Sequence, residues 1–150
     1  MADRLPFNGP VEFNQGLKVN SGVSYLRGGF VFPQPAAEAL ADNGDPITDA
    51  NIAARVMTIA AGDARSKALP AAANLISTLG LTADNDAADL SIINTDTTTD
   101  HILTVTAGAN TTIVGSPLCN PRVDGEDTIG SALFRVRRAS STTVQIFRIA

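Results

Sequence analysis

The chain is poor in aromatic, cysteine and charged residues. Its 150 residues include no Trp, one Tyr, one His and one Cys, and 17% are charged, against roughly 25% in an average soluble domain. A single cysteine excludes an intrachain disulfide, so packing has to stabilise the fold. The net charge of −4 lacks the basic excess that neutralises phosphates, so we expect no nucleic acid partner.

Long apolar runs are missing as well. No stretch approaches the ~20 consecutive apolar residues that cross a bilayer. The N-terminal sequence MADRLPFNGPVEF has no apolar core of the kind found in secretory signals. We therefore expect no membrane segment and no membrane partner. Hydrophobic residues still make up 44% of the chain, which is enough for one domain with its own core.

The first third of the chain differs from the rest. Prolines and glycines interrupt residues 1–50, which disfavours long regular elements. The same segment carries four of the six Phe and the only Tyr. We expect an extended N-terminal arm over 1–50 that contacts a partner through apolar anchors, namely Phe7, Phe13, Leu17, Tyr25, Phe30 and Phe32. The alternative is that these residues pack as extra strands on their own domain.

Two local elements are expected within this arm. Residues 11–19 alternate around Asn14-Gln15-Gly16, which is typical of a small hairpin. Residues 36–44 favour one or two helical turns that end at Asn43-Gly44.

Residues 51–150 read as a β-rich body with one short α-helix. The helix is expected over 69–80, since Pro70 suits a first turn and Gly80 suits the residue after the last turn. Its apolar face would carry Ala72, Leu75, Ile76 and Leu79. β-branched and alternating segments predict strands over 54–60, 89–94, 102–107, 111–114, 131–138 and 142–149.

Turn residues between these strands predict two hairpins. One joins 102–107 to 111–114 through Gly108-Ala109-Asn110, and the other joins 131–138 to 142–149 through Ala139-Ser140-Ser141. Many short strands separated by such turns indicate a mainly β fold, an antiparallel β-sandwich or barrel.

Candidate chemistry is sparse. His101 has only Asp96 and Asp100 as neighbouring ligands, so a structural zinc site is excluded and we expect an exposed residue at the start of a strand. Asp84, Asp86 and Asp89 are the oxygen ligands that calcium prefers, but their spacing fails the EF-hand pattern, and a solvated turn is the simpler interpretation.

Catalytic motifs are missing too. A serine triad using His101 would need a nucleophile, and no Gly-x-Ser-x-Gly elbow is present. No phosphate-binding glycine loop is present either. Cys119 is expected to be a small, half-buried apolar residue rather than a nucleophile. We therefore expect no enzyme activity, no catalytic residue, no metal and no cofactor.

Four arginines cluster near the C-terminus, at 135, 137, 138 and 148. One interpretation is ordinary surface solvation. The other is a subunit interface in which Arg135, Arg137 and Arg148 pair with acidic groups of a sister subunit or of a partner.

Four segments occur in an order that resembles a module of tailed phages and related viruses. They are a proline-led helix from Leu69 to Leu79, an Asp-rich turn and strand from Asp86 to Asn94, a Thr-rich hairpin from Thr104 to Gly115, and a C-terminal hairpin from Phe134 to Arg148. Together they cover most of residues 69–150. The module occurs in virion structural proteins, particularly small head-decoration or cement proteins and some fibre-like proteins.

This resemblance implies a function. Such proteins are β-rich and commonly trimeric, and they bind at junctions between major capsid protein subunits, often through an extended arm. We expect a homotrimeric capsid decoration protein on the outer surface of the virion, made in the host cytoplasm, with the major capsid protein and itself as partners. The alternative is a tail-fibre or receptor-binding module that recognises a carbohydrate, and a weaker third is a small hydrolase.

Overall fold

A computed structural model describes residues 35–123 and 130–150. The predicted hairpin at 11–19 and the six predicted arm residues, Phe7 to Phe32, lie outside these ranges. The unit that contains the sheets spans Pro33–Ala150. It is mainly β, as the sequence predicts.

Nine strands and two helices make up the described residues. The helices are α1 (Asp49–Ala54) and α2 (Ala72–Leu79). The strands are β1 (Glu38–Ala39), β2 (Val56–Ile59), β3 (Arg65–Ala68), β4 (Ala87–Asn94), β5 (Leu103–Thr106), β6 (Thr111–Val114), β7 (Leu118–Cys119), β8 (Ser131–Arg138) and β9 (Val144–Arg148).

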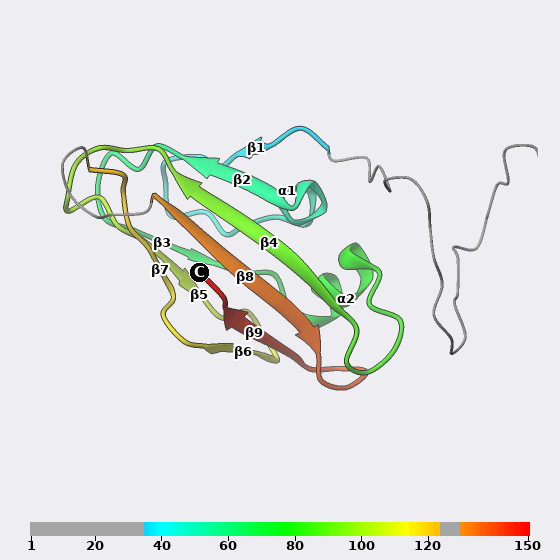
Figure 1. The fold of residues 1–150 in the computed structure, drawn as a ribbon. Helices are drawn as coiled ribbons and strands as arrows, with labels where there is room; N and C mark the ends of the chain where they lie inside the picture. Colours follow the sequence, from blue (N-terminus) through cyan, green and yellow to red (C-terminus); the bar gives the residue numbers. More distant parts are fainter. Residues whose placement is uncertain (1–34, 124–129) are drawn as a thin grey trace, which may run out of the picture. The chain divides into compact units, whose positions relative to one another are not determined.

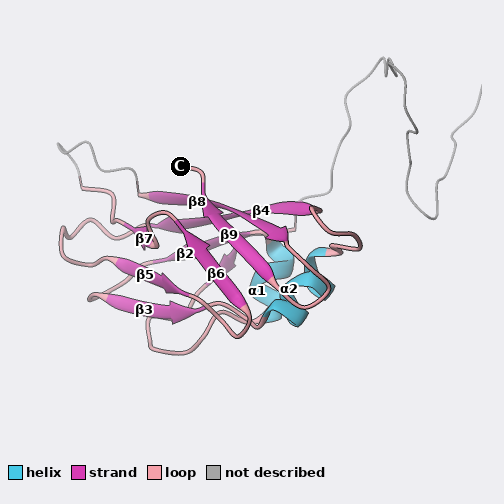
Figure 2. Ribbon diagram, turned by 90° about the horizontal axis from the view of Figure 1, so that it is seen from below, coloured by secondary structure: helices cyan, strands magenta, loops and turns pink. Residues whose placement is uncertain are grey.

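The strands form two sheets (Figure 1). One has six strands in the order β1-β2-β4-β8-β9-β6, and the other has three in the order β3-β5-β7. In the view of Figure 2 both helices lie together near one end of the sheets. One hydrophobic cluster draws on both sheets, since Leu103 and Cys119 of the small sheet belong to it together with Leu90 and Phe134 of the large one.

The sheets are mixed, so the predicted antiparallel arrangement is wrong for most strand pairs. Within the described ranges, β1–β2, β2–β4, β3–β5 and β6–β9 are parallel, and β4–β8, β5–β7 and β8–β9 are antiparallel. Parallel pairs need long crossovers. The chain between β2 and β4 provides one, since it includes both β3 and α2.

The predicted hairpin between 102–107 and 111–114 is also wrong. Both strands form, and Asn110 has the expected positive φ of 58°. However, β5 pairs with β3 and β7 in the small sheet, while β6 pairs with β9 at the edge of the large one. Turn residues fix local geometry, whereas burial selects the partner: Ile113 packs against the core opposite Ile146 of β9.

The C-terminal hairpin and the helix expected within residues 69–80 are confirmed. β8 and β9 pair antiparallel, and their alternation buries Phe134 and Val136 on one strand and Val144 and Ile146 on the other. Helix α2 buries Ala72, Leu75 and Leu79 and half-buries Ile76. It ends at Gly80, whose φ of 67° is the left-handed conformation that glycine adopts without strain.

Helix α1 is an addition to the one helix that the sequence predicts. Thr48 caps it, since its hydroxyl accepts from the N–H of Asn51 and the Asn51 side chain accepts from the N–H of Thr48. This reciprocal cap stabilises a helix that is only six residues long. The helical turns expected over 36–44 do not form. β1 lies there instead, and Leu40 donates to the carbonyl of Thr58.

The described end of the predicted arm belongs to the body. Leu40 and Ile47 are 8% and 2% exposed and are members of the core cluster. The body therefore begins before residue 51, and only the residues outside the described ranges remain to form an arm.

Candidate functional site

An open groove lies on the outer face of the large sheet, over β2, β4 and β8. Its volume is about 550 Å3. Its lining combines apolar, hydroxyl and charged side chains: Arg55, Val56, Ala87, Ala88, Asp89, Ser91, Leu133 and Arg135. Strand alternation produces this mixture, because the neighbouring residues of β4 point into the core.

A bidentate ion pair lines the groove. Arg135 Nε and Nη2 donate to Asp89 Oδ1 and Oδ2 at 2.8 and 2.9 Å. The residues face each other across β4 and β8 in register. These hydrogen bonds from Arg135 lower the pKa of Asp89, and the same contact raises the pKa of Arg135. The predicted interface residue Arg135 is therefore already paired within its own chain.

Arg55 adds a second positive charge to the groove. It follows α1 with a φ of 63°, a left-handed conformation that is uncommon outside glycine. Within the described residues no hydrogen bond or ion pair to its guanidinium is formed. With Asp89 already paired to Arg135, the groove has one positive charge left over and is suited to an acidic group of a ligand or partner.

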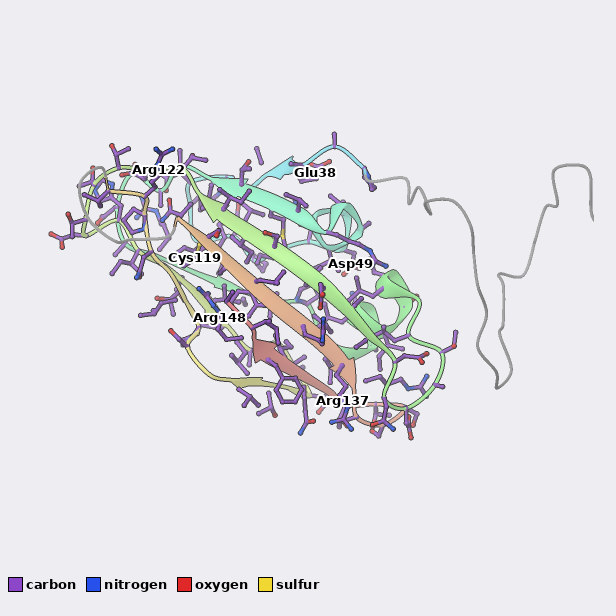
Figure 3. All side chains as sticks on the ribbon, in the orientation of Figure 1. Glu38, Asp49, Cys119, Arg122, Arg137 and Arg148 are labelled. Atoms are coloured by element: carbon purple, nitrogen blue, oxygen red, sulfur yellow. The ribbon has the colours of Figure 1, made fainter. Side chains whose placement is uncertain are left out.

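The other predicted interface arginines are also bonded within the chain. Arg137 donates to Asn85 Oδ1, and to Gln145 Oε1 at 2.9 Å. Arg148 donates to the carbonyls of Leu118 and Ser131 and lies 5.3 Å from the centre of the Phe134 ring. Figure 3 shows Arg137 and Arg148 toward different ends of the β8–β9 hairpin. The interface remains a prediction.

Replacing both Arg135 and Arg137 with Ala tests whether these arginines form a subunit interface or are ordinary solvated surface residues. The Arg135–Asp89 pair is 51% and 42% exposed, and exposed pairs contribute little to stability. We expect Tm to change by no more than about 2 °C, while the oligomer mass from light scattering falls. The control is Arg65→Ala, which removes another arginine–aspartate pair, with Asp42 at 2.8 Å. An unchanged oligomer mass in the double variant would contradict the interface.

His101 forms a short-range pair with Asp96. The two side chains meet at 3.0 Å between Nδ1 and Oδ1, and both are mostly buried. His101 precedes β5, as predicted, but is less exposed than expected. Among the described residues, Asp96 is the side chain that forms a hydrogen bond with the His101 ring.

The three carboxylates of the Asp-rich turn are bonded within the chain. Asp84 pairs with Arg138 at 3.2 Å, Asp86 accepts from the N–H of Ala83 at 2.7 Å, and Asp89 is held by Arg135. Their carboxylates therefore serve different partners. No group of three potential metal-ligating residues occurs within residues 35–123 and 130–150.

Asp86 makes stability depend on pH. The hydrogen bond from the N–H of Ala83, followed in strength by that from Thr82, lowers its pKa below 3.8. A carboxylate with a depressed pKa stabilises the fold above its unfolded-state pKa, and this contribution disappears as the pH falls through its folded-state pKa. We expect the Tm of the wild type to fall more steeply than that of Asp86→Asn between about pH 4 and pH 2. Asp100→Asn is the control; parallel curves for the wild type and Asp86→Asn would be the contrary result.

Cys119 is fully buried, more so than predicted. Its thiol donates to the carbonyl of Ile92 at 3.4 Å. Desolvation raises the pKa of this thiol. A buried thiol with a raised pKa is a poor nucleophile, in agreement with the structural role expected from the sequence.

Exposed apolar side chains gather where β9 ends. Val114 of β6, Leu118 of β7 and Ile149 are 42%, 38% and 49% exposed. Val114 lies opposite Phe147 in the β6–β9 pair, and Arg148 connects this region to the Leu118 carbonyl at 2.7 Å. In the described chain these three are the large hydrophobic side chains that remain exposed.

Sequence reasoning missed Arg55 and Lys67. Arg55 lies between α1 and β2, whereas the sequence places it inside a predicted strand over 54–60, and the sequence pattern therefore gives no sign of the groove. Lys67 is 2% exposed, yet its sequence context, Arg65-Ser66-Lys67-Ala68, has no alternation that would indicate a buried strand.

Comparison with family models, curated proteins and solved structures found no match to this chain. None of the helices in the described residues is long and apolar enough to cross a membrane.

Proposed function

We propose that the chain is a non-enzymatic virion structural protein, a capsid decoration or cement protein that binds between major capsid protein subunits and stabilises the head. In this proposal the two sheets form a sandwich-like rigid body, which assembles as a homotrimer on the outer surface of the capsid. Binding only to the assembled shell would favour the assembled state by mass action.

The observation that carries the proposal is a well-packed body in a chain that is poor in charged residues, with large apolar side chains left exposed on its surface. Twenty-three apolar residues of the described chain are buried, while Val114, Leu118 and Ile149 stay exposed around the end of β9. Exposed apolar side chains that gather in one region are typical of protein contacts. The order of segments resembles the phage module, and this resemblance supports the major capsid protein as the partner.

The apolar residues of the first third complete the proposal. Phe7, Phe13, Leu17, Tyr25, Phe30 and Phe32 would anchor an extended arm on the capsid. Because Leu40 and Ile47 belong to the core, the arm that can be removed without damaging the body ends near residue 34.

The groove over β4 favours one alternative. Its size, its hydroxyl and guanidinium groups and its open shape suit a small polar ligand. A tail-fibre or receptor-binding module that recognises a carbohydrate is therefore the second candidate.

Co-sedimentation with empty capsids of the encoding virus tests the proposal. The full chain should pellet with capsids and remain in the supernatant without them. A variant lacking residues 1–34, shown by circular dichroism to keep its β spectrum, should stay in the supernatant. Arg55→Ala in the full chain is the matched control, and we expect it to pellet like the wild type.

The opposite pattern supports the second candidate. A chain that ignores capsids but binds glycans on an array, with binding lost in Arg55→Ala and retained without residues 1–34, would overturn the decoration function.

A further inference from the structure

Lys67 is a buried amine without a carboxylate partner. It lies on β3 and is 2% exposed, and within the described residues no acidic side chain lies within ion-pair distance of it. Its Nζ donates to the carbonyl of Asp45 at 2.9 Å and to Asn43 Oδ1 at 3.3 Å. A buried cation normally has an opposite charge beside it, so an amine held by neutral acceptors calls for an explanation.

The Asn43 carboxamide is polarised from both sides by Asp45. Its Oδ1 accepts from the Asp45 N–H at 3.0 Å, and its Nδ2 donates to Asp45 Oδ2 at 2.5 Å. A hydrogen-bond donor at the carbonyl oxygen and a carboxyl group at the amide nitrogen are the groups that assist attack on an amide carbon. The amine, the donor and the carboxyl group thus converge on one carboxamide.

Burial also favours the neutral, nucleophilic form of the Lys67 amine. Desolvation lowers the pKa of Lys67, and nearby Arg65 acts in the same direction, while the charges of Asp45 and Asp42 oppose the shift. A lowered pKa increases the fraction of neutral amine, the form that carries a nucleophilic lone pair.

We propose that Lys67 and Asn43 form an intramolecular isopeptide bond. The Lys67 Nζ lone pair attacks Asn43 Cγ, and the Asp45 N–H stabilises the developing oxyanion. The new C–Nζ bond replaces the C–Nδ2 bond. Nζ gives up one proton and Nδ2 takes up one, and the Asp45 carboxyl group, which accepts the hydrogen bond from Nδ2, assists its departure as ammonia. No electrons are gained or lost, so no oxidant or further reactant is needed.

The bond would cross-link two distant parts of the body. It joins the segment between β1 and α1 to β3, where the Ile47 N–H already donates to the Ala68 carbonyl at 2.9 Å. The closed loop would run from residue 43 to residue 67 and would restrict the unfolded chain. This inference stands on the geometry alone and does not depend on the proposed function.

Mass spectrometry of the full chain tests the inference. Loss of ammonia lowers the intact mass by about 17 Da relative to the sequence. Trypsin does not cleave after an acylated lysine, so the digest should contain one branched peptide that joins residues 28–55 to residues 66–122. Lys67→Arg keeps the charge and should show the full mass and no branched peptide.

A second reaction of Asn43 gives the same mass change, and the Gly44→Ala variant distinguishes it from the isopeptide bond. Asn43-Gly44 can close to a succinimide, which also releases ammonia but leaves Lys67 free. Gly44→Ala disfavours that closure, and a Cβ at Gly44 would meet no atom within 4 Å. The isopeptide predicts that the mass loss survives in Gly44→Ala. A wild-type chain of full mass, or a loss without the branched peptide, would overturn the proposal, and neither result requires a variant to fold.

Discussion

Asn94→Asp should destabilise the protein by about 3–5 kcal/mol at pH 7. Asn94 is fully buried at the end of β4. Its Nδ2 donates to the carbonyls of His101 and Cys119, at 2.8 and 3.4 Å, and so connects the large sheet to the small one. Aspartate has the same shape but places an ionised oxygen against two carbonyl oxygens. Chemical denaturation at pH 7 measures the loss.

The same variant should recover stability in acid. Its new carboxyl group is buried, so its pKa is raised in the folded state, and the penalty grows as the pH rises through the unfolded-state value and beyond. The difference between variant and wild type should therefore shrink from pH 7 to about pH 4. Asn85→Asp is the control, since the Asn85 side chain is exposed and its Oδ1 accepts hydrogen bonds from Arg137. Equal stability of Asn94→Asp and wild type at pH 7 would refute the inter-sheet role.

Gly108→Ala should destabilise the protein by about 3 kcal/mol or more. A Cβ at this position would lie 2.3 Å from the carbonyl oxygen of Pro70 and 2.4 Å from that of Leu69. These are backbone atoms of the segment that leads into α2, so neither can rotate away as a side chain would. Relief requires the segment after β5 to move, although the Ala109 carbonyl accepts from the N–H of Ala72 at 2.9 Å. Thermal unfolding should show a large drop in Tm.

Gly44→Ala is the matched control for this variant. Gly44 has open space around the added methyl group and no positive φ, so we expect stability within about 1 kcal/mol of the wild type. Equal unfolding temperatures of the two alanine variants would contradict the close approach of Gly108 to the backbone of Leu69 and Pro70.

The sequence predicted local elements well where the spacing of apolar residues and the residues that begin or end an element indicate the same structure. Helix α2 begins after Pro70 and ends at Gly80, and the β8–β9 hairpin forms with the expected inward residues Phe134 and Val136. These patterns depend on neighbours in the chain, which the sequence displays directly.

Strand partners escaped prediction because burial selects them over long distances. β6 follows β5 after a turn that suits a hairpin, yet it pairs with β9, more than thirty residues later. Nothing in the Thr111–Val114 sequence marks that choice. The candidate site shares this difficulty: Arg55, Asp89 and Arg135 meet only after β2, β4 and β8 lie side by side.

Cryo-electron microscopy of the native particle tests the central proposal most directly. We predict density for the two-sheet body on the outer surface of the capsid, at junctions between major capsid protein subunits, with three copies around each site. A capsid surface without this density, or density for the body in the tail, would contradict the account.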